Sequence, residues 1–129
     1  MRAMNLKRLF CMLGLLMCAG NIIGQHMNEK DAPCQGIGPA AAVTQCIVAE
    51  SQSAEKELKV ALEEIRNGLS TADRNRLQVA QGLWIQFRAA NCAAARGLYD
   101  GGSAAPSVYY ACLASDTRQR ITELNTMYR

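Results

Sequence analysis

The chain has few of the residues that usually build catalytic sites. Among its 129 residues there is a single histidine, His26, and aromatic residues make up only 5%. His26 lies in a polar stretch near the N-terminus, without the positioned and shielded surroundings that general acid–base catalysis requires. The sequence also contains no glycine-rich phosphate loop and no cluster of metal-ligand residues. We therefore predict that the protein is not an enzyme and that it uses no cofactor and no metal.

The chain also has no strong excess of positive or negative charge once the N-terminal segment is left out of the count. The whole chain has 14 basic and 11 acidic residues, a formal net charge of +3. Three of the basic residues, Arg2, Lys7 and Arg8, lie in a segment that we expect to be removed, which leaves 11 residues of each sign. A near-neutral protein has no general electrostatic attraction for nucleic acid. We predict no nucleic-acid partner.

The one long apolar run is too short to span a membrane. It covers residues 9–20 and follows the basic residues, whereas a spanning helix needs about 20 apolar residues. This pattern predicts a secretory signal peptide over residues 1–24, cleaved after Gly20 or Gly24, and no stable membrane insertion. An uncleaved anchor is disfavoured by the short run. A lipid anchor on Cys18 is disfavoured because Met17, directly before it, is not small.

Four of the six cysteines lie beyond this signal: Cys34, Cys46, Cys92 and Cys112. Exported proteins mature in an oxidising compartment, so we predict a periplasmic or secreted domain with two disulfides. The gaps of 12, 46 and 20 residues lack the paired C-x-x-C knuckles of zinc sites. Three pairings are possible. A turn near residue 69 puts Cys46 level with Cys92, which favours Cys46–Cys92 together with Cys34–Cys112.

Apolar residues with helical periodicity dominate the rest of the chain. We divide it into an extended leader, residues 25–38, and a helical domain, residues 39–129. The first helix is predicted to begin near Pro39 and to end at Gly68 in the left-handed conformation of a helix cap. Spacings of three, four and seven mark its buried face. The residues of this face are Ile47, Ala54, Leu58, Ala61, Leu62 and Ile65.

Cap and turn signals predict two further helices. Residues 70–73, Ser-Thr-Ala-Asp, fit a capping box, and the second helix should end between residues 97 and 101. After the Gly101–Gly102 turn, Ser103 can cap a third helix that has Pro106 in its first turn. Because both connections are short and no segment alternates with a period of two, we predict an all-α, antiparallel three-helix bundle stapled by the disulfides. The predicted buried faces are Leu77, Ala80, Trp84, Phe87 and Cys92 in the second helix, and Tyr110, Leu113, Thr117, Ile121, Leu124 and Tyr128 in the third.

Gln81, Trp84 and Arg88 lie on one stripe of the second helix. They are either an exposed aromatic and cationic surface for a partner or structural residues, with Trp84 filling the bundle. Because Leu77 and the other predicted core residues interleave with them, we favour the structural role. Gly82 destabilises a helix interior by about 1 kcal/mol relative to alanine. We expect a neighbouring helix to approach it closely.

These residues also carry a resemblance to a known family. The series Leu77, Gln81, Trp84, Phe87, Arg88 and Cys92 resembles the core motif of the LprI-type lysozyme inhibitor domain. The flanking residues agree over residues 34–124: Cys34 and Cys46 twelve apart, Gly101–Gly102–Ser103, Cys112–Leu113, Thr117, Arg120 and Leu124. The resemblance implies an exported, disulfide-bonded helical domain of bacteria. Some relatives are implicated in inhibiting host lysozyme.

The resemblance favours a non-enzymatic binding protein whose partner is a lysozyme or another cell-wall hydrolase. A structural or accessory envelope protein, or an immunity partner of a wall-attacking toxin, is the alternative. For an inhibitor we expect the contact at residues 99–103. Tyr99 is an aromatic anchor, Gly101 and Gly102 let the backbone enter a narrow cleft, and Ser103 offers a hydroxyl. In the simpler interpretation, the two glycines only let the chain reverse.

Overall fold

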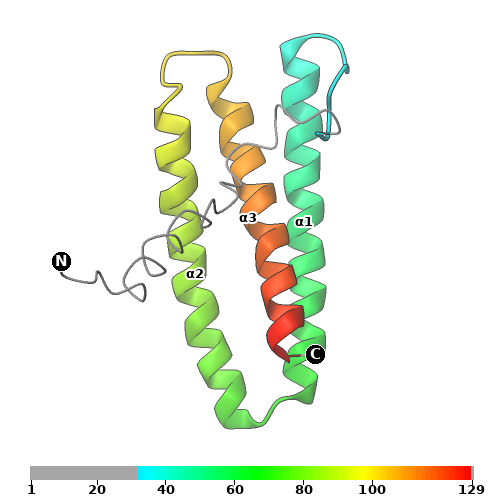
Figure 1. Cartoon of the computed structure of the whole chain (residues 1–129), viewed down its shortest axis with the longest axis vertical. Coiled ribbons are helices and arrows are strands. Elements are labelled where there is room, and N and C mark those ends of the chain that lie inside the picture. The colour runs from blue at the N-terminus through cyan, green and yellow to red at the C-terminus, as the bar shows by residue number, and fades with distance from the viewer. Residues whose placement is uncertain (1–31, 129) are drawn as a thin grey trace, which may run out of the picture.

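The computed structural model of this protein describes residues 32–128. Three helices, α1 (Ala40–Gly68), α2 (Thr71–Gly97) and α3 (Ala105–Tyr128), make up most of this part, and it contains no strand. Consecutive helices run in opposite directions (Figure 1), which confirms the predicted all-α, disulfide-stapled three-helix bundle. No helix among residues 32–128 is long and apolar enough to cross a membrane. The predicted signal peptide lies outside the described residues.

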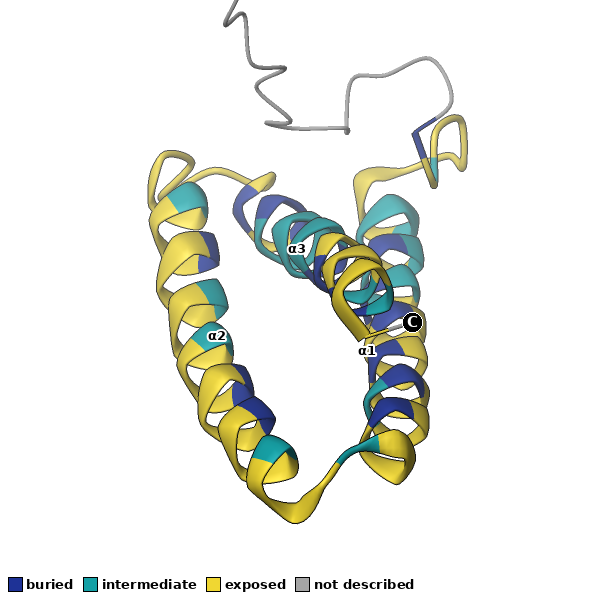
Figure 2. Ribbon diagram, turned by 60° about the horizontal axis from the view of Figure 1, so that its bottom comes forward, coloured by how far each residue is buried: buried dark blue, intermediate teal, exposed yellow. Residues whose placement is uncertain are grey.

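α3 holds the bundle together. It packs along both α1 and α2, whereas α1 and α2 hardly contact each other. Figure 1 shows α1 and α2 joined at one end, with α3 returning between them. Figure 2 shows that the buried and half-buried residues of α2 lie mainly along a narrow strip and that most of this helix is exposed. This follows because, within residues 32–128, α3 is the helix that packs along α2.

The apolar core lies toward the end where α1 joins α2. Leu58 and Ile65 of α1, Leu77 of α2 and Leu124 of α3 form its centre, and Leu77 and Leu124 are almost fully buried. The predicted buried face of α1 is confirmed except that Leu62 is half-buried. Partly buried side chains pack at the edge of this core: Leu62, Leu69, Trp84 and Ile121.

The boundary between α1 and α2 agrees with the predicted residues and differs in one detail. α1 ends at Gly68, but the chain leaves the helix through an extended Leu69 and not through a left-handed glycine. Ser70 caps α2 as predicted, since its Oγ accepts a hydrogen bond of 3.2 Å from the backbone N–H of Asp73. The hydrogen bond that the Ser70 hydroxyl donates to the Asp73 carboxylate, followed by that from Arg76, lowers the pKa of Asp73.

The start of α3 differs from the prediction. The helix begins at Ala105, and the carbonyl of Ala104 accepts the first helical hydrogen bond, from the N–H of Val108. Ser103 is therefore outside the helix, and its hydroxyl bonds to no other described residue. Pro106 lies in the first turn, where its missing N–H needs no partner, as predicted.

Several predicted core positions of α2 and α3 were wrong. Phe87 is 62% exposed, Ala80 is exposed and Tyr128 is 39% exposed. For Phe87 and Ala80, the prediction assumed that α2 packs against both other helices, whereas α3 alone of the two packs along it and buries a narrower stripe. Tyr128 is the last residue of α3. The expectation that a neighbouring helix approaches Gly82 closely is also wrong, because a Cβ added at Gly82 would meet nothing within 4 Å.

Candidate functional site

Gln81, Trp84 and Arg88 lie where α2 meets α3, in a polar layer that joins all three helices. The Arg88 guanidinium donates a hydrogen bond of 2.7 Å to Oγ1 of Thr117 on α3, and it forms an ion pair of 3.2 Å with Glu55 on α1. Only 14% of the Arg88 side chain is exposed. A charge held this far from water and bonded on two sides is suited to fixing helices in place rather than to binding a partner.

Two guanidinium groups approach the indole ring of Trp84. Cζ of Arg88 lies 4.9 Å from the ring centroid, and Cζ of Arg120 lies 5.9 Å from it. Both distances are within the range of cation–π attraction. Arg120 also donates from Nε to the buried amide oxygen of Gln81, at 3.2 Å. Gln81, Trp84 and Arg88 are thus linked through the guanidinium groups inside the bundle. This geometry fits a structural role for the three residues.

The disulfides are Cys34–Cys46 and Cys92–Cys112, with Cα–Cα distances of 5.8 and 5.5 Å. The favoured pairing of Cys46 with Cys92 and of Cys34 with Cys112 was wrong. Cys46 and Cys92 are on α1 and α2, which hardly contact each other, so being level along the bundle does not bring them together.

The leader instead folds back onto the first turns of α1. Cys34 has a φ of 70°, and Gly36 and Gly38 have φ values of 75° and 84°. These left-handed residues reverse the chain between Cys34 and the start of α1, so that Cys34 reaches Cys46. The first disulfide therefore ties the leader to α1, and the second ties α2 to α3 beside the turn that connects them.

Residues 98–104 form that turn, and two glycines shape it. Gly101 has a φ of 79°, which favours glycine. The Gly102 N–H donates a hydrogen bond of 3.0 Å to the carbonyl of Tyr99, and a Cβ at Gly102 would lie 3.2 Å from that oxygen. The chain reversal alone thus accounts for both glycines. Tyr99 is 37% exposed, and Asp100 and Ser103 are exposed as well.

One group in the described part has the spacing of a metal site, namely Cys92, Cys112 and Asp116. Both sulfur atoms are joined in the second disulfide and are not thiolates, so they are not available as metal ligands. The Asp116 carboxylate accepts a hydrogen bond of 3.0 Å from the side chain of Asn91. The group therefore forms part of the link between α2 and α3.

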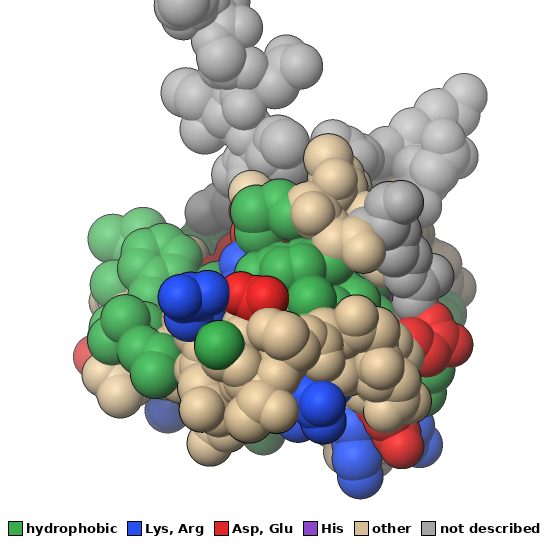
Figure 3. All heavy atoms as spheres, turned by 90° about the horizontal axis from the view of Figure 1, so that it is seen from below, with side chains coloured by type: hydrophobic (Ala, Val, Ile, Leu, Met, Phe, Trp, Pro, Cys, Tyr) green, Lys and Arg blue, Asp and Glu red, His purple; other side chains and the backbone are tan. Residues whose placement is uncertain are grey.

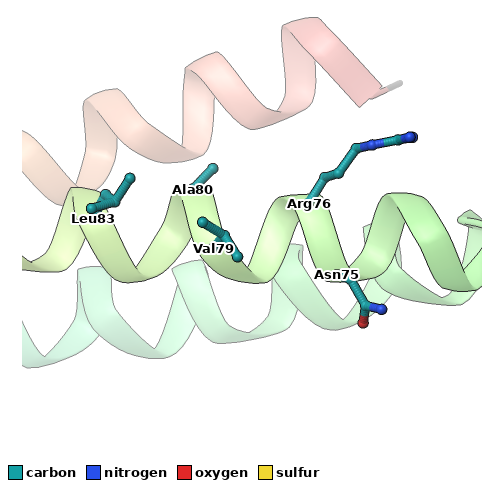
Figure 4. Close-up of a pocket in the computed structure, with 5 residues that line it drawn as sticks. All are labelled: Asn75, Arg76, Val79, Ala80 and Leu83. Atoms are coloured by element: carbon teal, nitrogen blue, oxygen red, sulfur yellow. The ribbon is translucent and has the colours of Figure 1, made fainter.

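Sequence reasoning missed an apolar surface on α2, which we call the outer face. It consists of Val79, Ala80, Leu83, Phe87 and Leu98, all of them exposed. Figure 3 shows hydrophobic side chains gathered on the side of the molecule where α2 lies. An open depression at one end of this face is lined by Val79, Ala80 and Leu83 together with Asn75 and Arg76 (Figure 4). The spacing of four from Val79 to Leu83 and Phe87 was the sequence signal for it.

Comparison with known proteins identifies the family. The model of the lysozyme inhibitor LprI family matches residues 31–124, which include both disulfides and the polar layer. No curated protein and no solved structure gives a match to the chain. The matched segment covers most of the sequence and agrees with the resemblance of the α2 motif and the four paired cysteines. The chain belongs to the LprI lysozyme inhibitor family.

Proposed function

We propose that this protein is an exported, non-enzymatic inhibitor of a lysozyme or of another cell-wall hydrolase. Membership of the LprI family is the observation that carries this proposal. A signal peptide over residues 1–24, cleaved after Gly20 or Gly24, delivers the protein to the periplasm or the exterior. The two disulfides support this location, since disulfides persist in oxidising compartments.

The contact that we propose is the turn between α2 and α3. It lies at the end of the bundle opposite the turn between α1 and α2 (Figure 1). Its tip is narrow because Gly101 and Gly102 have no side chains, and the disulfide between Cys92 and Cys112 joins the two helices next to it. A turn whose two flanking helices are joined by a disulfide loses little conformational freedom on binding, which favours affinity.

The chemistry of the turn suits the cleft of a glycosidase. Such clefts carry a pair of catalytic carboxyl groups. Ser103 has an exposed hydroxyl that can donate a hydrogen bond to a carboxylate, and Tyr99 offers a partly exposed ring for stacking. Asp100, the only charged residue of the turn, should lie away from those carboxyl groups. Inhibition is then steric, because the turn occupies the position of the substrate.

An activity titration tests this proposal. The oxidised protein, purified from the periplasm of a bacterium that expresses it, is added to an animal lysozyme and to bacterial cell-wall hydrolases. We expect stoichiometric inhibition of at least one of these enzymes, weakened more than tenfold by Tyr99→Ala, a loss typical of an interface anchor. Tyr128→Ala is the matched control, because Tyr128 has a similar exposure of 39% at the other end of the bundle.

Gly102→Asp provides a second probe of the same turn, with folding checked by circular dichroism. Absence of inhibition throughout the panel contradicts the inhibitor function. Inhibition that survives both turn variants contradicts the location of the contact and directs attention to the exposed carboxylates of α1 between Glu55 and Glu64.

A further inference from the structure

The outer face of α2 is an unusually uncharged surface for an exposed helix. Between Arg76 and Arg96 the only charged residue is Arg88, and its side chain points inward to Thr117 and Glu55. Val79, Leu83, Phe87 and Leu98 are 66%, 63%, 62% and 78% exposed. These side chains form an apolar stripe that neither α1 nor α3 covers.

We propose that a second copy of this chain covers the outer face, with the two α2 helices packed antiparallel about a twofold axis near Arg88. In this register each large side chain meets a complementary one. Leu83 faces Ala94 of the second copy, Phe87 faces Ala90 of the second copy, and Val79 faces Leu98 of the second copy. Ala90 and Ala94 are exposed and small, so the two backbones can approach closely and the larger side chains can interlock.

Charge complementarity supports a second copy in this direction. The same register brings Arg76 beside Asp100 of the second copy, once at each end of the interface. The Arg76 side chain, which pairs with Asp73 of its own helix at 2.6 Å, is 78% exposed, and Asp100 is exposed, so a second carboxylate can approach the same guanidinium. A parallel arrangement would instead place Arg76 against its own equivalent. Like charges facing each other oppose association, so the antiparallel arrangement is favoured.

The exposed area is of the size that a dimer requires. A stable interface buries about 800 Å² on each partner. The four large apolar side chains of the outer face supply on the order of half of this area, if each buries most of its exposed surface in the interface. The alanines, Arg76 and Asp100 provide the remainder. The resulting dimer carries its two Tyr99–Ser103 turns at opposite ends, so one dimer can bind two target molecules.

The solution mass of the oxidised protein, exported and purified from the periplasm, tests the proposal. Analytical ultracentrifugation from about 1 to 100 μM covers the range in which a micromolar Kd is visible. We expect a reversible dimer, and Leu83→Glu should raise its Kd by at least about thirtyfold, as for a hot-spot residue. Val60→Glu is the matched control, since Val60 is 55% exposed on α1, and it should leave the Kd unchanged.

A charge-swap mixture tests the register. Arg76→Glu alone and Asp100→Arg alone should each weaken the dimer, because each creates two like-charge pairs. An equimolar mixture of the two variants should restore association, because both pairs in the mixed dimer are then opposite in sign. A wild-type protein that stays monomeric overturns the proposal, as does a dimer that Leu83→Glu leaves intact or a mixture that restores nothing. If the wild-type protein is monomeric and Leu83→Glu abolishes its inhibition of lysozyme, the outer face binds the target enzyme and the dimer proposal is wrong.

Discussion

Trp84 and Phe87, three residues apart on α2, have opposite surroundings. Trp84 packs at the edge of the core and interacts with Arg88 and Arg120, whereas Phe87 is 62% exposed. Both were predicted to be buried, because helical spacing places them within one broad apolar stripe. The sequence does not reveal that, of the helices within residues 32–128, α3 and not α1 packs along α2. This packing determines which of the two residues is covered.

This contrast gives a direct prediction. Trp84→Ala should lower the free energy of unfolding by about 3 kcal/mol, because it removes a large packed side chain and the ring that both guanidinium groups face. Phe87→Ala should change it by less than about 0.5 kcal/mol at a protein concentration where the chain is monomeric, as for other exposed positions. Urea unfolding followed by circular dichroism measures both. Equal losses would contradict the assignment of Trp84 to the bundle and of Phe87 to the surface.

At the scale of helices and turns, local signals located most boundaries correctly. Ser70 predicted where α2 begins, and Gly68 predicted where α1 ends, because caps depend on neighbouring residues only. The end of α2 at Gly97 lies within the predicted range of residues 97–101. The disulfide pairing and the exposure of Gly82 could not be predicted in this way. Both depend on the separation of α1 from α2, which arises from the packing of the whole bundle.

Two glycine substitutions test this view of the helices. Gly82→Ala should raise the free energy of unfolding by about 0.5–1 kcal/mol, because alanine favours the helix and nothing lies near the new Cβ. Gly101→Ala should lower it, because Gly101 has a φ of 79° that strains any residue with a Cβ. Thermal unfolding curves compare the two variants. Destabilisation by Gly82→Ala would show that a neighbour does approach this face of α2.

At the scale of the whole molecule, the two disulfides connect different parts of the structure. The bond between Cys92 and Cys112 joins two helices of the bundle next to the proposed binding turn, and Cys92 is fully buried. The bond between Cys34 and Cys46 attaches only the leader to the start of α1. The number of disulfides followed from the cysteine count, but the different parts that they connect became visible only with the three-dimensional arrangement.

Removing each disulfide should therefore have different consequences. The double variant Cys92→Ser, Cys112→Ser should lose about 2–4 kcal/mol of stability, the usual effect of a native disulfide. The double variant Cys34→Ser, Cys46→Ser should lose less, because it releases a leader that lies outside the bundle. Urea unfolding of both variants under oxidising conditions gives the comparison. A greater loss from the second variant would contradict the account.

The central claim is that the LprI-family bundle binds a wall hydrolase through the turn between α2 and α3. Hydrogen exchange of the oxidised protein, measured with and without the hydrolase that it inhibits most strongly, tests this claim most directly. We expect the added protection to centre on residues 98–104, with little change in α1. Protection confined to the α1 segment from Glu55 to Glu64, or no protection under conditions of full inhibition, would contradict it.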